Sequence, residues 1–413
     1  MIRTHGKPMI IFSLVFLYFF VFMHNSASAY DIEGISIHGF LSQGYITSSD
    51  NTYLTDSKDG SYEFTESGIN FSIEPIEKLR LGLQLFSRDL GDEGNNEVVL
   101  DWGFGDYHWK DYLGLRAGKI KLPFGFYNQT RDVDFLRSSI LLPQGIYSEN
   151  MREILVSYQG GSIYGNILLG GFGNCDYELF TGTSNLDNSS PFVVDFVGTF
   201  ASAVAAALSI SPVVTNIDAS FDETIGGAIR WNTSIDGLRF GVTNFVADIE
   251  ATSTLSAATF IMDIQVKEYS VLSAEYIWNK LMINAEYGRR EYDVGLKYGG
   301  ADLPTVNLKQ EGFYAGMSYQ FCDRFQLGTY YSVFYPNKED KNGDDLEALG
   351  LPDYMAWQKD WAVSARVDAN EHVVLKLEAH FIDGTGLLFT HLNPPAKMEK
   401  NWEMFVAKVS FNF

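Results

Sequence analysis

The final segment of the chain alternates between two sets of side chains and ends on an aromatic residue. The first set is Phe405, Ala407, Val409, Phe411 and Phe413, and the second is Val406, Lys408, Ser410 and Asn412. A period of two places the two sets on opposite faces of a β-strand. One face can meet lipid while the other meets water, so the segment predicts a strand that crosses a membrane as part of a barrel.

The amino-terminal segment predicts a secretory signal. Arg3 and Lys7 precede an apolar run from Met9 to Met23, and Ala27-Ser28-Ala29 supplies the small residues of a cleavage site. This run is shorter than a membrane-spanning helix requires. We therefore expect residues 1–29 to be a cleaved signal peptide, and residues 30–413 to form one β-barrel in a bacterial outer membrane.

Alternating segments recur along the chain in pairs joined by very short connections. Seven tight turns are predicted at Pro75-Ile76-Glu77, Lys110-Asp111-Tyr112, Gly160-Gly161, Asp236-Gly237, Asn279-Lys280, Cys322-Asp323-Arg324 and Ala369-Asn370-Glu371. These hairpins, a first strand near Ile35–Ile46 and the final strand together make about sixteen strands. The predicted fold class is all-β, a transmembrane antiparallel β-barrel. Each segment alone would also suit a soluble β-sandwich. A β-sandwich would not explain the secretory signal, or why the short turns lie at one end of the strands and the long connections at the other.

The remaining connections are long and are predicted to face outward from the cell. They fall at about 47–61, 88–97, 120–151, 171–223, 247–264, 289–311, 335–357 and 383–400. The longest, 171–223, contains an Ala-rich stretch from Phe196 to Val214 that is interrupted by Pro212. We expect this stretch to be a helix or strand of the loop rather than a spanning helix, and it could either plug or cap the pore.

A short motif lies where the third long connection begins. Arg116-Ala117-Gly118-Lys119, followed by Lys121-Leu122-Pro123-Phe124-Gly125, resembles the phosphate-selective porin O and P family and its wider porin relatives. The resemblance implies a homotrimer of sixteen-stranded barrels, each with its third extracellular loop folded inward. It also implies passive diffusion of small hydrophilic, often anionic, solutes, with outer-membrane lipid and lipopolysaccharide as surroundings.

Charged residues near this motif are the candidate lining of the pore and its constriction. They are Arg80, Arg116, Lys119, Lys121, Arg131, Asp132, Asp134 and Arg137. Opposed charges across a constriction orient polar solutes, although the same residues could be local salt bridges. Lys119 falls in the outward register unless its strand has already ended.

Strand alternation also predicts which charges face the lumen. Basic residues are expected inward at Arg80, Arg88, Arg116, Arg230, Arg239, Lys267, Arg290, Arg366, Lys376 and Lys408, against Glu66, Glu74, Asp101, Glu153, Glu275, Glu286, Glu378 and Asp368. This mildly basic lining predicts a weak preference for anions. The family resemblance implies that phosphate is among them.

Other features of the sequence narrow the function further. A formal net charge of −22 argues against nucleic-acid binding. No nucleophile motif accompanies the histidines and no haem-attachment motif is present, so we expect neither an enzyme nor a cofactor. The alternative function is an adhesin, receptor or structural envelope protein that acts through long acidic loops.

Two small features remain. Asp340, Asn342, Asp344 and Glu347 form a weak Ca²⁺ candidate, but a solvated acidic loop is the preferred explanation. Cys175 and Cys322 are expected at opposite ends of the barrel, too far apart for a disulfide bond.

Overall fold

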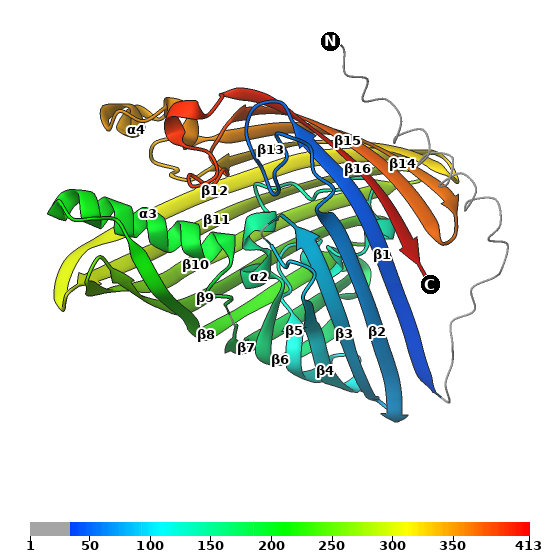
Figure 1. Ribbon diagram of the computed structural model, residues 1–413. Coiled ribbons are helices and arrows are strands. Elements are labelled where there is room, and N and C mark those ends of the chain that lie inside the picture. Colours follow the sequence, from blue (N-terminus) through cyan, green and yellow to red (C-terminus); the bar gives the residue numbers. More distant parts are fainter. Residues whose placement is uncertain (1–33, 92, 185) are drawn as a thin grey trace, which may run out of the picture.

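The chain closes into a barrel of sixteen antiparallel strands. The computed structural model describes residues 34–413 apart from residues 92 and 185, so the predicted signal peptide 1–29 lies outside the described residues. Each strand pairs with its neighbours in sequence, and β1 pairs with β16 (Figure 1). The strands are β1 (Ile35–Ser48), β2 (Phe64–Ile76), β3 (Leu79–Leu90), β4 (Val98–Lys110), β5 (Leu113–Lys121), β6 (Ser157–Leu168), β7 (Asn174–Thr183), β8 (Val214–Asn232), β9 (Leu238–Leu255), β10 (Ala258–Trp278), β11 (Leu281–Tyr298), β12 (Ala301–Cys322), β13 (Phe325–Tyr335), β14 (Gln358–Asn370), β15 (Val373–Gly384) and β16 (Asn401–Asn412). The predicted strand number and all-β class are confirmed.

Six of the seven predicted turns join the strands as expected, and one prediction was wrong. Gly160-Gly161 lies within β6, and the β6–β7 turn is formed by residues 169–173. The two glycines do not form a turn but allow β6 to lie close to its neighbouring strands. A Cβ at Gly160 would lie 2.0 Å from the Thr181 carbonyl oxygen. Gly170 and Gly173 have the positive φ angles that the true turn requires.

The position of the β6–β7 turn also places Cys175 elsewhere than predicted. Because β7 begins at Asn174, Cys175 lies beside the short β6–β7 turn, and Cys322 lies beside the short β12–β13 turn. Both cysteines are therefore at the short-turn rim of the barrel, not at opposite ends as predicted. Both are free thiols.

Two predicted long loops are in fact continuations of strands. Residues 247–264 and 289–311 belong to β9–β12, which are joined by two-residue connections at 256–257 and 299–300. The predicted loop 171–223 shrinks to the connection 184–213. Strands β8–β12 consequently contain 18 to 22 residues, whereas the other strands contain 9 to 14.

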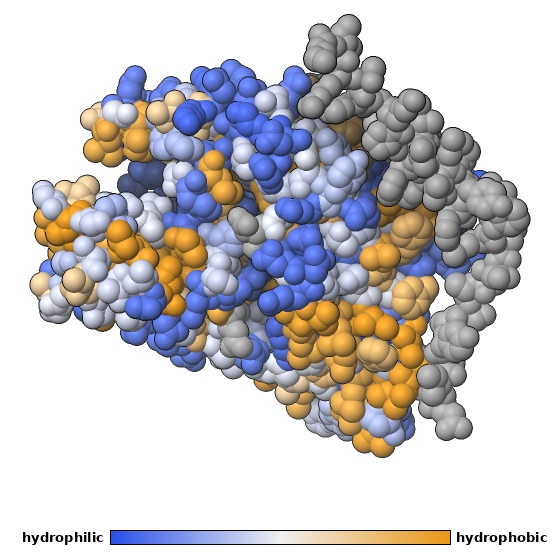
Figure 2. Space-filling view, in the orientation of Figure 1, coloured by the Kyte–Doolittle hydropathy of each residue, from blue (hydrophilic) through white to orange (hydrophobic). Residues whose placement is uncertain are grey.

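The outward face of the barrel is apolar in the half nearest the short turns. Exposed outward side chains there include Leu81, Leu83, Leu115, Ile163, Leu272, Ile283, Leu327, Val363 and Leu377. Figure 2 shows part of this apolar surface at the lower right, over the region of β2–β4. An apolar outward band is what a barrel in lipid requires.

The polarity of the wall reverses along the long strands. On β9 the outward residues change from the apolar Phe240 and Val242 to the charged Asp248 and Glu250. The inward residues change in the opposite sense, from polar side chains such as Thr243 to apolar side chains. The sheet therefore leaves the lipid near Val246 and continues into water. We call residues 214–221, 247–266 and 292–308 the raised wall (Figure 1). Because its charged outer face resembles loop sequence, it was predicted as loops.

A single long helix covers the inner side of the raised wall. Helix α3 (Pro191–Leu208) is long and apolar enough to span a membrane, but its Val193, Val197 and Ala201 are buried in the core that includes Ala219 and Phe245. Ser190 caps its first turn by accepting a hydrogen bond from the Val193 amide.

The other helical elements of residues 34–413, leaving aside 92 and 185, are short. They are α2 (Arg152–Leu155), α4 (Asp344–Ala348) and 3₁₀ turns at Asn128–Thr130, Asp134–Leu136, Glu149–Met151, Gly170–Phe172, Asp353–Ala356 and Pro395–Lys397. The Ca²⁺ candidate residues lie at and before α4, where the Asn342 amide donates to Asp344. Within the described part of the chain, no three His, Cys, Asp or Glu side chains form a group that could hold a metal ion.

Candidate pore constriction

The connection between β5 and β6, residues 122–156, crosses the interior of the barrel. Its backbone amides reach side chains on the inward faces of distant strands: Phe126 N–H donates to Glu286 (2.9 Å), and Ile140 and Leu141 N–H donate to the two oxygens of Glu378 (2.7 and 2.9 Å). The Gly145 amide donates to Ser332 (3.2 Å). These bonds fix the segment, which we call the inner loop, against the wall formed by β11, β13 and β15.

Asp134 anchors the inner loop to the closing strands. Its carboxylate lies 2.8 Å from Lys408 and 3.6 Å from Lys376, and it accepts a hydrogen bond from Ser410 (2.6 Å). Arg137 contributes a fourth contact at 3.4 Å. Burial alone would raise the pKa of Asp134, but Lys408 and Lys376 lower it well below its usual range. The carboxylate therefore stays charged and binds the inner loop to β15 and β16.

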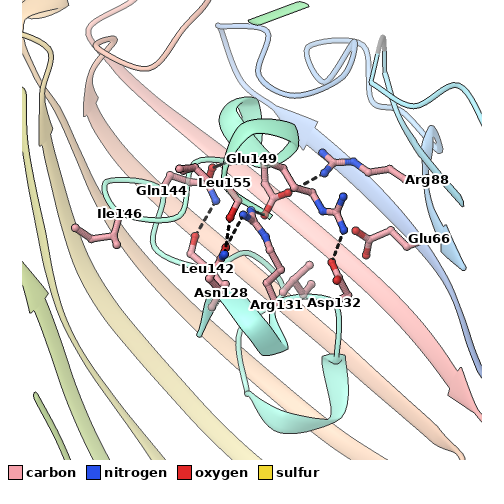
Figure 3. A network of polar contacts seen from close by, with 12 residues as sticks. Glu66, Arg88, Asn128, Arg131, Asp132, Leu142, Gln144, Ile146, Glu149 and Leu155 are labelled. Carbon is pink, nitrogen blue, oxygen red and sulfur yellow. Dashed lines mark hydrogen bonds and ion pairs between the residues drawn. The ribbon is translucent and has the colours of Figure 1, made fainter. Parts of the chain in front are cut away.

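A second anchor connects the inner loop to β3. Figure 3 shows Arg88 reaching Glu149, which also pairs with Arg131 of the same loop. The distances are 3.1 Å and 2.8 Å. Burial would raise the pKa of Glu149, but Arg131 and Arg88 together lower it to about 2. The Asn128 amide completes this region by donating to the Leu122 and Leu155 carbonyls.

Four charged side chains form a closed ring between β4, β5 and the inner loop. Lys121 lies 3.5 Å from Asp101 and 2.5 Å from Asp132, and Arg152 lies 3.4 Å and 2.7 Å from the same two carboxylates. Gln84 donates a further hydrogen bond to Asp101 (3.0 Å). We call Asp101, Lys121, Asp132 and Arg152 the charge ring. Its alternating signs cancel, so it carries no net charge.

Two chambers with charged side chains in their linings adjoin the charge ring. The outer chamber, of about 290 Å³, lies toward the long loops and includes Arg88, Glu93, Asp101, Arg152 and Glu153 in its lining. The inner chamber, of about 580 Å³, extends to the short-turn rim; its lining includes Arg80, Asp106, Arg116, Lys121, Glu178 and Arg230. Asp101 and Arg152 line one chamber and Lys121 lines the other, so the ring stands between them.

Most of the predicted site cations have acidic partners. Arg116 lies 3.2 Å from Asp106 and 3.4 Å from Glu178, and its guanidinium stacks 4.2 Å from the Tyr164 ring centre. Arg80 donates to Ser72 (2.9 Å) in the inner chamber. Lys119 is in the outward register and donates to the Leu100 carbonyl (2.6 Å), where β4 separates from β5.

The arrangement differs from the predicted one in three respects. Arg152 was not among the predicted site residues, because the predicted loop ended at residue 151. Lys267 was expected to face the lumen, but the β-bulge after Val266 changes the alternation, and Lys267 pairs with Asp293 on the outer face. Asp132 and Asp134, both predicted as residues of the constriction, belong to two separate clusters.

The comparisons with known proteins establish the fold. No family model matches the chain, and no curated protein matches it. Among solved structures, in-vitro folded OmpT, an outer membrane protein of Vibrio cholerae, has a TM-score of 0.55 at 11% identity over 94% of this chain and 100% of that one.

Two further solved structures cover the whole barrel. The outer membrane channel DcaP of Acinetobacter baumannii has a TM-score of 0.54 at 11% identity, covering 93% of this chain and 100% of its own. The anion-selective porin from Comamonas acidovorans has a TM-score of 0.51 at 10% identity, covering 92% and 99%. The chain thus has the fold of Gram-negative outer-membrane porins.

Proposed function

We propose that this protein is an outer-membrane porin, a non-enzymatic channel for passive diffusion of small hydrophilic solutes and ions. The observation that carries this proposal is the pair of chambers, lined in part by charged side chains inside a closed barrel, on either side of the charge ring. A solute would enter by the outer chamber, pass the ring and leave through the inner chamber. Residues 1–29 would direct export and then be removed.

The preference for anions is proposed to be weak. Arg80, Arg116 and Arg230 line the inner chamber, and the motif that resembles the phosphate-selective porin O and P family ends beside it. However, Asp106 and Glu178 pair with Arg116, and the charge ring is neutral. Selectivity reflects the local charges that line the passage. Paired cations attract anions less than free ones, so phosphate would block the channel only at high concentration.

We also propose that the protein forms a homotrimer in a bilayer that contains lipopolysaccharide. A hollow of about 640 Å³ on the wall is lined by Lys119, Gln159 and the glycines 103, 118 and 160. A lysine in the outward register is costly against hydrocarbon, by about 2–4 kcal/mol at the bilayer centre. This face is therefore better suited to a neighbouring subunit than to lipid.

Conductance across planar bilayers tests the channel and the role of the charge ring together. Asp101→Asn combined with Arg152→Gln removes one charge of each sign, which opens the ring without changing its net charge. We expect conductance to rise several-fold while the reversal potential under a salt gradient changes little. The matched control is Lys267→Gln with Asp293→Asn, an ion pair on the outer face, which should leave conductance unchanged.

Two results would contradict the proposal. Clear cation preference of the unmodified protein would exclude weak anion selectivity. A protein that neither conducts ions nor swells liposomes, yet binds cells or ligands, would favour the receptor or adhesin alternative.

A further inference from the structure

The interior of the raised wall is apolar, unlike the interior of the barrel below it. Neighbouring strands place Phe221 opposite Ile249, and Ile249 opposite Ile264, all on the inward face. Porin interiors are polar because water fills them. An apolar interior above the membrane therefore requires a different explanation from the passage of hydrophilic solutes.

Helix α3 and the inner loop cover this apolar surface but do not fill it. A cavity of about 80 Å³ remains between α3, the end of the inner loop and strands β8–β11. Its lining includes Leu155, Phe196, Ala219, Phe221, Ile249 and Ile264, and it exposes no polar atom. Figure 1 shows α3 lying along the raised wall at the left of the molecule.

The volume and chemistry of the cavity define what can occupy it. A water molecule needs about 10–15 Å³ but also two to four polar partners, which this lining does not offer. Apolar cavities of this type stay dry and bind apolar molecules, and one of about 150 Å³ holds benzene. The present cavity is about half that size, so it suits a short alkyl chain rather than an aromatic ring.

We propose that the space beneath α3 is a binding site for a small, uncharged alkyl compound at the outer mouth of the barrel. The driving force is the removal of hydrocarbon from water. The two chambers beside the charge ring cannot serve this purpose, because charged side chains line both. The site does not require ion flow, so its test is independent of the channel.

A tryptophan in place of Phe196, which lines the cavity, reports binding of bromoethane, a short alkyl compound whose bromine quenches fluorescence. The full protein carrying Phe196→Trp is incorporated into lipid nanodiscs, because detergent chains would compete for the site. The signal of the unmodified protein is subtracted, since the chain contains seven native tryptophans. We expect saturable quenching that removes at least half of the difference signal.

Two matched variants distinguish the cavity from the surrounding lipid. Val194→Trp places the reporter on the exposed side of the same helix and should show only linear, weak quenching. Ala219→Leu, added to Phe196→Trp, fills the cavity and should weaken binding about tenfold; Ala251→Leu is the second filling variant. Shifted mobility on unheated gels verifies that each barrel is folded.

Linear quenching of Phe196→Trp, equal to that of Val194→Trp, would overturn the proposal. Saturable quenching that both filling variants leave unchanged would overturn it equally, because the bromoalkane would then bind elsewhere.

Discussion

At the scale of single residues, several buried charges in the barrel interior are paired with more than one opposite charge. Asp134 is the strongest case, since Lys376, Lys408 and Arg137 all converge on one carboxylate. Lys376 and Lys408 are each at most 5% exposed, so neither can turn to solvent if the carboxylate is lost. Removing one partner of a buried ion pair leaves an uncompensated charge.

Asp134→Asn should therefore lower the free energy of unfolding by about 3–5 kcal/mol. Denaturant titration of the protein in lipid vesicles measures this change. Asp345→Asn on the exposed surface of α4 is the control and should stay within about 0.5 kcal/mol. Equal values for the two variants would show that the Asp134 cluster does not stabilise the inner loop.

At the scale of elements, β9 shows where the barrel leaves the membrane. Val242 and Glu250 lie on the same outward face of one strand, yet one is apolar and the other charged. The change in polarity marks the boundary between lipid and water.

Val242→Arg should destabilise the protein by up to about 2–4 kcal/mol, because it places a charge against lipid. Glu250→Arg on the same face should change stability by less than about 0.5 kcal/mol. Unfolding in vesicles measures both. A large loss for Glu250→Arg would move the membrane boundary above the raised wall.

The short turns depend on glycine at particular positions. Gly237 between β8 and β9 has φ +76°, and a Cβ there would lie 2.0 Å from the Ile277 carbonyl oxygen. Gly237→Ala should cost at least about 1–3 kcal/mol. Gly171 in the β6–β7 turn has open space around it, so Gly171→Ala is the matched control and should be close to neutral. Thermal melting of both variants gives the comparison.

The sequence predicted the elements well where polarity follows the rules for lipid-facing strands. Sixteen strands could be predicted because most pairs of segments alternate and are joined by a tight turn. The raised wall could not be predicted, since Asp248 and Glu250 on its outer face resemble a solvated loop. The charge ring was partly missed because the inner loop brings Arg152 back to Asp101 on β4, a contact that no local sequence pattern encodes.

At the scale of the whole molecule, the outer chamber is a compartment whose charge can change near neutral pH. Burial raises the pKa of Glu93 to about 7, although Arg88 opposes the shift. The carboxyl is therefore neutral below pH 7 and negative above it. The lining also contains Arg88 and Arg152, together with Lys119 from the gap where β4 separates from β5, and the other acidic groups are Glu97, Asp101, Glu153 and Asp187.

Ion selectivity should consequently depend on pH. Between pH 8 and pH 6 the reversal potential should move toward anion preference, because the outer chamber loses a negative charge. Glu93→Gln should abolish this shift, whereas Glu97→Gln in the same lining should retain it. A shift that persists in Glu93→Gln would assign the pH dependence to another group.

The closure of the barrel has a consequence for how the chain must be handled before it reaches the membrane. Phe40 pairs with Asn412, so the first strand acquires its second partner only after the last strand has been delivered. Contacts between residues so distant in sequence make folding slow, because the entropy of closing the loop is lost before the contact forms. An incomplete chain would present two unpaired strand edges, which are templates for aggregation. The proposed export therefore requires that the whole polypeptide stay unfolded until its final strand arrives.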